Sequence, residues 1–204
     1  MQPFRPMLAA RAKEPFDHED WIFEVKYDGF RALAYLEEGK CQLVSRRNHV
    51  YKSFQKLSSW LGENVQVLDA VIDGELVCLG QDGKPLFNQL LYRRGEPYFY
   101  AFDLLRLNGE DLRKEPLIER KRLLKEIMPP APSRLLFASH QEGSCKDLFR
   151  AACAADLEGL VAKWKFGTYA AGDITSWVKI KNPHYSQAKD RHEQFTKFRH
   201  LELR

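Results

Sequence analysis

The chain has 204 residues, of which 44% are hydrophobic and 29% are charged, a composition typical of a soluble globular protein with one medium-sized domain. No apolar run approaches the ~20 residues that a membrane-spanning helix needs, and the N-terminal residues combine prolines with mixed charge where a signal peptide would have an apolar stretch. We therefore expect a cytoplasmic protein with no membrane partner. The formal net charge of +4 permits a polyanionic partner but does not require one.

The cysteines and histidines do not suggest a metal centre. Cys41, Cys78, Cys145 and Cys153 include no C-x-x-C pair, and no histidine has a metal-like spacing with another histidine or a cysteine. Reduced thiols are therefore expected, without a zinc site or a disulfide framework. No G-x-x-x-x-G-K-[ST] run is present, which excludes a P-loop enzyme.

The N-terminal half predicts mostly strands. Residues 19–26 are rich in aromatic and β-branched residues and predict a strand, after which Asp28-Gly29 indicates a tight turn. Residues 30–46, with "EEGK" at their centre, predict a β-hairpin. The next segment, 50–61, predicts a helix with one apolar face, made of Val50, Phe54, Leu57 and Leu61.

The remaining elements follow the same reasoning. Residues 67–79 predict a strand pair or one long strand, and residues 97–107 predict another strand that ends at an "NGED" turn. Helices are predicted over 117–128, before Pro129 and Pro130, and over 145–156; short strands are predicted over 134–140, 157–164 and 175–181. Since strands outnumber helices and regular βαβ alternation is absent, the expected fold is α+β, with two mainly antiparallel sheets flanked by helices.

Six charged residues lie in or at the ends of the apolar strand runs: Lys26, Glu75, Glu158, Lys163, Lys179 and Lys181. Charged side chains are rarely buried unless they are paired. One such residue alone indicates the solvent face of a strand. Six of them, on several strands and with both signs represented, favour a polar cleft between two sheets.

The local sequences around these charges form a series of motifs. They are "VKYDGFR" with Lys26, "DGELV" with Glu75, "FYAFDLL" with Phe102, "EGLVAK", which pairs Glu158 with Lys163, and "WVKIK" with Lys179 and Lys181. In this order they resemble the nucleotidyltransferase domain of ATP-dependent DNA ligases, RNA ligases and mRNA capping enzymes. Together with "RPMLA" and "KNPHYSQ", they are most similar to the ligase domain of bacterial end-joining ligases. The resemblance implies an ATP-grasp-like adenylation domain with a nucleotide cleft between its sheets.

The resemblance implies a covalent mechanism at Lys26. This lysine would attack the α-phosphate of ATP to form lysyl-AMP, and a lysine attacks only as the free amine, which burial or nearby cations favour. Lys179 and Lys181 match family lysines that contact the nucleotide phosphates. They would offset the charge that develops at phosphorus.

Other matches extend the implied nucleotide site. Phe102 matches the aromatic residue that stacks on adenine, and Val161 would either cover the other ring face or pack in the core. Glu24 lies where the family reads the adenine amino group, Arg31 matches an arginine at the ribose, and Arg46 matches one that meets phosphate. Lys163 belongs to the same nucleotide-binding set. Glu75 and Glu158 match carboxylates that contact the ribose or bind Mg²⁺ or Mn²⁺.

The function that the resemblance implies is ATP-dependent sealing of nicked or broken double-stranded DNA. AMP would pass from Lys26 to a 5′-phosphate, and a 3′-hydroxyl would then displace it. An RNA ligase, a GTP-dependent capping-type nucleotidyltransferase, and a nucleic-acid binding module without turnover remain alternatives, and RNA remains an alternative partner. Basic and aromatic residues alternate after Lys179, so this stretch is either a solvated helix or a contact surface for backbone phosphates.

Two features depart from the family pattern. Asp173 occupies the position of a family arginine, and an acid beside a triphosphate predicts weak ATP binding or a different alignment there. Residues 1–182 match the nucleotidyltransferase domain and 183–204 form a basic tail, so we expect no OB-fold domain and slow self-adenylation. A separate protein would then supply the OB-domain or end-binding function. We expect a monomer in the bacterial cytosol or nucleoid.

Overall fold

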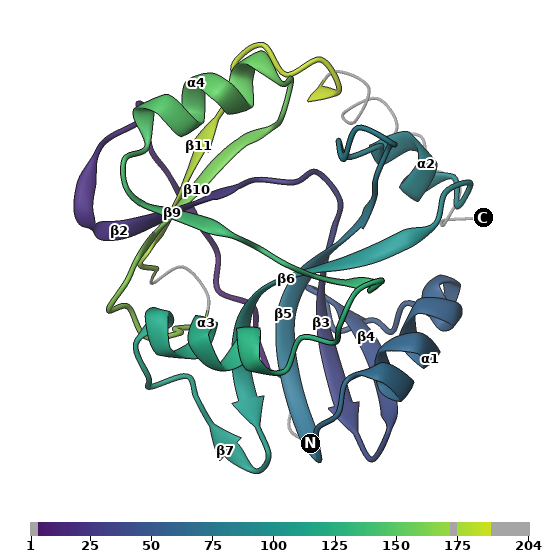
Figure 1. Ribbon diagram of the computed structural model, residues 1–204. Coiled ribbons are helices and arrows are strands. Elements are labelled where there is room, and N and C mark those ends of the chain that lie inside the picture. Colours follow the sequence, from purple (N-terminus) through teal and green to yellow (C-terminus); the bar gives the residue numbers. More distant parts are fainter. Residues whose placement is uncertain (1–3, 172–174, 189–204) are drawn as a thin grey trace.

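The computed structural model describes residues 4–171 and 175–188, and it shows an α+β fold built on two β-sheets (Figure 1). Most neighbouring strands in both sheets are antiparallel, and the helices lie on the outer faces. The predicted fold class is therefore confirmed. Within the described residues, no helix is long and apolar enough to cross a membrane.

The larger sheet has six strands in the order β4-β3-β5-β6-β7, with β8 pairing to β6. Its strands are β3 (Phe30–Glu37), β4 (Lys40–Ser45), β5 (Asp69–Cys78), β6 (Pro97–Leu107), β7 (Glu110–Asp111) and β8 (Leu135–Phe137). Only the β6–β8 pair is parallel among these described strands. Residues 69–78 form one long strand, which resolves the alternative of a strand pair.

The smaller sheet has five strands in the order β1-β11-β10-β2-β9. Its strands are β1 (Ala10–Arg11), β2 (His18–Val25), β9 (His140–Gly143), β10 (Gly159–Trp164) and β11 (Trp177–Lys181). In this described sheet, β1 and β11 are parallel and the other pairs are antiparallel. The two-residue strand β1 and the polar strand β9 have too little apolar pattern to be predicted.

The chain passes from the smaller to the larger sheet at residues 26–29, between β2 and β3. The expected tight turn at Asp28-Gly29 is therefore wrong, because this segment connects two sheets instead of two paired strands. Gly29 is required by space: a Cβ there would lie 2.0 Å from the carbonyl oxygen of Leu76. Tyr185 donates a hydrogen bond of 3.3 Å from its hydroxyl to Oδ2 of buried Asp28, which ties the crossover to the described start of the predicted tail.

Helices close the outer faces. The larger sheet packs against α1 (Gln55–Asn64), α2 (Phe87–Leu91) and α3 (Leu117–Glu126) through an apolar cluster, and α4 (Lys146–Ala154) covers the smaller sheet (Figure 1). A 3₁₀ turn, η1 (Lys52–Phe54), precedes α1. Phe54, Leu57 and Leu61 are buried as expected, whereas Val50 is 46% exposed because it precedes the helix and bridges to Val44.

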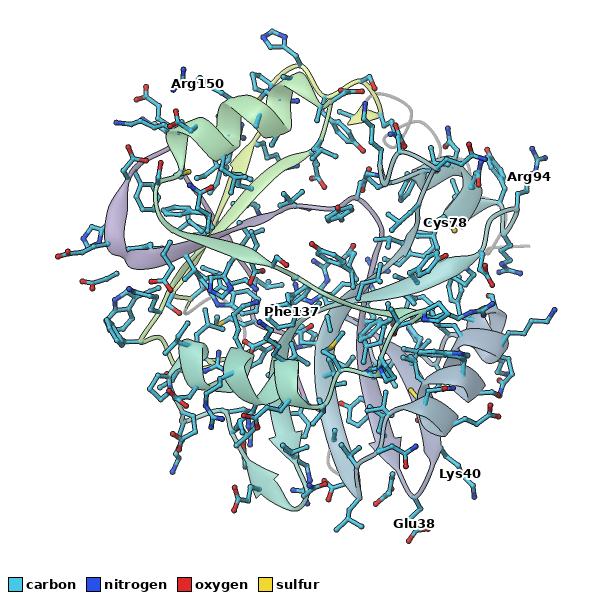
Figure 2. All side chains as sticks on the ribbon, in the orientation of Figure 1. Glu38, Lys40, Cys78, Arg94, Phe137 and Arg150 are labelled. Atoms are coloured by element: carbon cyan, nitrogen blue, oxygen red, sulfur yellow. The ribbon has the colours of Figure 1, made fainter. Side chains whose placement is uncertain are left out.

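Side chains fill the space between the two sheets (Figure 2). We call this the inter-sheet layer: it consists of buried Met7, Leu33, Val71, Leu105, Tyr169 and Trp177, with Phe102 and Val161 packed against them. Because side chains alternate along a strand, the charged residues that share a face with this layer are brought together between the sheets.

Candidate active site

Lys26 lies immediately after β2, where the chain leaves the smaller sheet. Its backbone N–H donates a 2.9 Å hydrogen bond to the carbonyl of Gly159, and its Nζ lies 2.6 Å from Oε2 of Glu158. The other carboxylate oxygen of Glu158 is 3.5 Å from Nζ of Lys181. Two of the predicted lysines therefore share one nearly buried carboxylate, while Lys26 itself keeps 22% of its side chain exposed.

Glu24 lies on β2 and is buried between two lysines. Its carboxylate is 2.6 Å from Nζ of Lys121 on α3 and 2.7 Å from Nζ of Lys163 on β10. Burial opposes ionisation of Glu24, but the two ammonium groups outweigh it and hold its pKa below the usual value. The expected pairing of Glu158 with Lys163 is not what the structure shows: Lys163 pairs with Glu24, while Glu158 pairs with Lys26 and Lys181.

Burial lowers the pKa of Lys163 to about 8, with the charge of Lys121 acting in the same direction. The folded chain then releases this proton near pH 8, whereas an unfolded chain keeps it until about 10.5. Between these values the unfolded state binds more protons, so this lysine makes the free energy of unfolding rise with pH, on the order of 1 kcal/mol per pH unit. We predict that Lys163→Met removes this rise, as measured by urea unfolding of both proteins across that range. Equal pH slopes in the two proteins would contradict the assignment.

Register places a row of side chains on one face of the smaller sheet. Glu24 is opposite Val161, Val161 is opposite Lys179, and Lys179 is opposite Arg11 on β1. Burial lowers the pKa of Lys179, and the charges of Lys181 and Lys26 lower it further. The predicted nucleophile Lys26 and the predicted phosphate-contacting Lys181 are therefore close enough for their charges to act on Lys179.

Arg31 on β3 lies in the inter-sheet layer and is held by Asp73. The guanidinium makes two hydrogen bonds of 2.6 Å to the carboxylate of Asp73, which also accepts a 2.6 Å bond from the hydroxyl of Tyr169. The Cζ of Arg31 lies 4.5 Å from the ring centroid of Phe102, and Nζ of Lys163 lies 4.4 Å from it. The expected adenine-stacking ring thus contacts cations.

The remaining predicted residues lie around this centre. Glu75 is opposite Arg31 in the β3–β5 register. Arg46 is exposed just after β4, next to Arg47. No group of three or more acidic, histidine or cysteine residues suited to a metal ion occurs among the residues that the structure describes. Asp173 and residues 189–204 of the expected basic tail lie outside the described residues.

Sequence reasoning missed several buried charged residues, including Asp103 on β6 and the three described next. Asp73 is fully buried on β5, and Arg120 and Lys121 are buried on α3. A signal was present for the last two, since both lie on the apolar stripe of their helix between Leu117 and Leu124. Asp73 was missed because the sequence left open whether residues 67–79 form one strand or two; Gly74 lies within the single strand, where a Cβ would be 2.6 Å from the ring of Phe99.

Comparison with known proteins assigns this arrangement to a family. The family model for the ATP dependent DNA ligase domain matches residues 6–181. The chain belongs to the ATP-dependent DNA ligase domain family. That match contains every site residue discussed above.

Similar proteins agree with membership of this ligase domain family. The chain is 31% identical over 186 residues to the multifunctional non-homologous end joining protein LigD of Pseudomonas aeruginosa, covering 86% of the chain and 22% of that protein. It is 30% identical over 211 residues to a DNA ligase of Pyrobaculum calidifontis, covering 92% of the chain and 36% of that protein. The chain thus spans well under two thirds of these longer relatives.

Solved structures show the same ligase domain fold. A mycobacterial DNA ligase D complexed with ATP and MES matches with a TM-score of 0.73 and 30% identity, over 87% of this chain and 60% of that one. The Chlorella virus DNA ligase-adenylate matches with a TM-score of 0.65 at 19% identity, over 87% of this chain and 69% of that one, and supports the fold alone.

Proposed function

We propose that this ligase domain is the nucleotide-binding catalytic core of an ATP-dependent DNA ligase, with Lys26 as its nucleophile. The observation that carries the proposal is the position of Lys26: it directly follows a strand of the smaller sheet, its Nζ is 2.6 Å from Glu158, and Glu158 also contacts Lys181. A partly exposed lysine beside other cations suits attack on a polyanion. Residues 1–182 would form the nucleotidyltransferase unit, and 183–204 would extend it toward nucleic acid.

In the first step, the neutral amine of Lys26 attacks the α-phosphorus of ATP. A nitrogen–phosphorus bond forms, the bond from the α-phosphorus to the bridging oxygen breaks, and pyrophosphate leaves with that oxygen. In the structure Lys26 is close enough to Glu158 for an ammonium–carboxylate pair, so a proton must leave before attack.

In the later steps, AMP moves from Lys26 to a 5′-phosphate of DNA, and the nitrogen–phosphorus bond breaks as a new diphosphate bond forms. A 3′-hydroxyl then attacks that 5′-phosphate, forming the phosphodiester and releasing AMP. Cations positioned at the phosphates supply most of what a protein contributes to such transfers.

The nucleotide would lie against the inter-sheet layer. Phe102 and Val161 are partly buried there and come from different sheets, so they are placed to contact opposite faces of adenine. Glu24 and Lys163 border the base, with Arg31 at the ribose and Arg46 at a phosphate. Arg31 is the best positioned of these, since Asp73 fixes its guanidinium with two hydrogen bonds.

Glu75 and Glu158 would hold Mg²⁺ or Mn²⁺. Carboxylate oxygens suit these hard cations, and Mg²⁺ commonly takes only one or two of them and completes its shell with phosphate oxygens and water. Glu158 is the carboxylate that contacts Lys26, and no larger cluster of metal-binding side chains occurs among the described residues, which fits such a shared site better than an all-protein cage. When bound, the metal would neutralise phosphate charge. Glu158 would contribute by exchanging its lysine contacts for the cation.

The experiment that tests the proposal is labelling with α-labelled ATP or GTP and Mg²⁺, followed by sealing assays on nicked DNA and nicked RNA. We predict a covalent adduct with ATP at least about tenfold more abundant than with GTP, and sealing of DNA in preference to RNA. Exclusive GTP labelling would indicate a capping-type enzyme. No adduct at any ATP or metal concentration would indicate a binding module without turnover.

A further inference from the structure

The chain segment that follows β11 is bonded to the loop that carries Glu158. We call residues 182–187 the strap (yellow, after β11, in Figure 1). The backbone N–H of Asn182 donates a 2.9 Å hydrogen bond to the carbonyl of Glu158, and its Nδ2 donates a 3.0 Å bond to the carbonyl of Leu157. Its Oδ1 accepts a 2.9 Å bond from the backbone N–H of His184. The first residue of the strap therefore fixes the backbone of Glu158.

The far end of the strap reaches the larger sheet. Gln187 accepts a 3.3 Å bond from the backbone N–H of Phe87 and donates a 3.2 Å bond to the carbonyl of Pro85, at the start of α2. Between the two ends, Ser186 donates to the carboxylate of Asp156 through both its backbone N–H and its hydroxyl. The strap therefore links the loop before β10 to a helix of the other sheet.

Tyr185 connects the strap to the segment that carries the nucleophile. Its ring is buried, and its hydroxyl donates a 3.3 Å bond to Oδ2 of Asp28, which is also buried. Burial and the charge of Asp28 raise the pKa of the Tyr185 hydroxyl far above its usual value, so the hydroxyl stays protonated and remains a donor. Asp28 lies only two residues after Lys26, and a shift of Asp28 is therefore passed directly to Lys26.

The crossover at residues 26–29 is held at both ends and has its side-chain anchor in the middle. At its start, the backbone N–H of Lys26 is bonded to the carbonyl of Gly159. At its end, Gly29 lies so close to the main chain of β5 that a Cβ has no room. Asp28 lies between these two points, where the bond from the strap meets the crossover.

We propose that Tyr185 is a positioning residue for the nucleophile: by holding Asp28, it keeps Lys26 in its place beside Glu158. The inference rests on the proposed function and adds a residue that acts on the reaction through another. Because the same strap also fixes the backbone of Glu158, the two members of the Lys26–Glu158 pair keep their relative position. Precise placement matters, since a displacement of about 1 Å can slow a reaction about 100-fold.

The alternative is that the strap only stabilises the fold, and the steps of the reaction separate the two roles. The first step uses Lys26 as the attacking amine. In the last step a 3′-hydroxyl attacks a 5′-phosphate that already carries AMP, and Lys26 is no longer bonded to AMP. A residue that positions Lys26 therefore affects the first step more than the last, whereas a loosened fold affects both.

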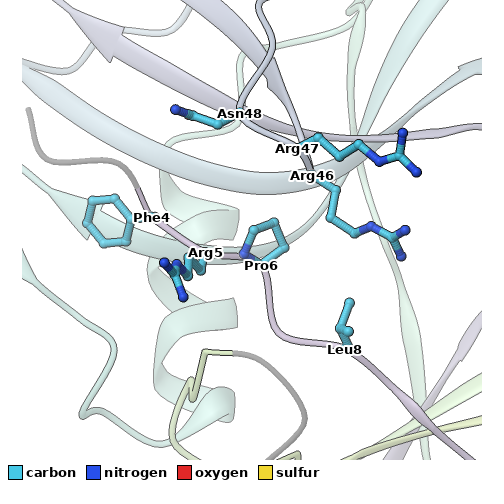
Figure 3. Close-up of a pocket in the computed structure, with 7 residues that line it drawn as sticks. All are labelled: Phe4, Arg5, Pro6, Leu8, Arg46, Arg47 and Asn48. Carbon is cyan, nitrogen blue, oxygen red and sulfur yellow. The ribbon is translucent and has the colours of Figure 1, made fainter.

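The test compares Tyr185→Phe, which removes only the hydroxyl, with Tyr92→Phe. Tyr92 is a matched control because it is 46% exposed after α2 and lies outside the proposed site. No strap residue lines the pocket of about 490 Å³ beside the loop that follows β4 (Figure 3), so a changed rate in Tyr185→Phe would not arise from altered walls of that pocket.

Two rates are measured on each protein. One is lysyl-AMP formation over a range of ATP concentrations, followed by intact mass, and the other is sealing of a nicked DNA duplex whose 5′-phosphate already carries AMP. In Tyr185→Phe we expect the maximal rate of lysyl-AMP formation to fall about tenfold, as the loss of a hydrogen bond to a charged group predicts. The half-saturating ATP concentration and the sealing rate should stay within about twofold of wild type. The control should match wild type in both assays.

Other results would overturn the inference. Equal losses in the two assays would show that Tyr185 only supports the fold, and an unchanged maximal rate would show that it does not position Lys26. Failure of the proposed function is distinguishable, because wild type itself would then form no lysyl-AMP. Thermal unfolding identifies any loss of folding in Tyr185→Phe. In that case Asp28→Asn, which weakens the same bond from its other end, must slow lysyl-AMP formation more than sealing.

Discussion

Replacing Lys26 with alanine is expected to abolish the covalent AMP adduct completely. The nucleophile must be an amine at the end of β2, and truncation at Cβ leaves no nitrogen there. Lys181 is the nearest substitute, since it also contacts Glu158 at 3.5 Å, but it extends from another strand and would have to leave its own place at the phosphates. The measurement is intact-mass spectrometry after incubation with ATP and Mg²⁺.

Lys26→Arg provides the matched variant for this experiment. Arginine keeps the positive charge beside Glu158, so the fold and the local electrostatics are preserved, but its guanidinium stays protonated and is not a nucleophile. The arginine variant should therefore also lack the adduct while its thermal unfolding stays close to wild type. Lys84→Ala, at an exposed loop position, should form the adduct normally. An AMP adduct that persisted on Lys26→Ala would refute the assigned nucleophile.

Sequence reasoning located the main elements because their patterns are strong. The strand before Lys26 and the hairpin over residues 30–46 are present, and the hairpin turns at Glu38 and Gly39, which have φ values of 49° and 74°, as a two-residue turn requires. Elements of two residues, such as β1, or with a polar composition, such as β9, have no period long enough to detect.

Partner choice among the charges was much harder to predict. Glu158 and Lys163 are close in sequence, yet they lie at opposite ends of a strand segment and pair with different residues. Glu24 receives a second lysine, Lys121, from a helix almost one hundred residues later. Long-range pairing depends on how the sheets and α3 pack, and a single sequence contains no direct record of that packing. A charged residue that lies on the apolar stripe of a helix is the feature of the sequence from which a buried ion pair can be predicted.

The largest effect on stability is expected at Arg120. Its guanidinium donates bonds of 2.7 Å and 2.8 Å to the carboxylate of Asp103, and both side chains are fully buried. It also donates to the carbonyls of Glu115 and Gly167. Arg120→Met would leave a buried carboxylate without its counter-charge, which costs about 3–5 kcal/mol, a large share of the ~5–15 kcal/mol that stabilises a typical domain.

The same substitution two residues later is the control. Arg122 lies on the same helix but is 56% exposed, and it pairs with Glu119 and Glu126 in solvent, so Arg122→Met should change stability by about 1 kcal/mol or less. Urea unfolding of both variants is the measurement. A shift in the urea concentration at the midpoint reports the change in the free energy of unfolding, provided that the slope of this free energy against urea concentration is the same in both variants. Because Asp103 directly follows Phe102, a loosened pair would also free the ring that we expect to contact adenine.

A double variant, Asp103→Leu with Arg120→Met, separates the loss of the pair from the loss of packing. Replacing both partners removes the unpaired charge, so this variant should recover a large part of the stability that Arg120→Met loses. A double variant no more stable than the single one would show that the backbone contacts of Arg120, and not its charge, hold α3 against β6. An Arg120→Met effect as small as that of Arg122→Met would contradict the importance of the buried pair altogether.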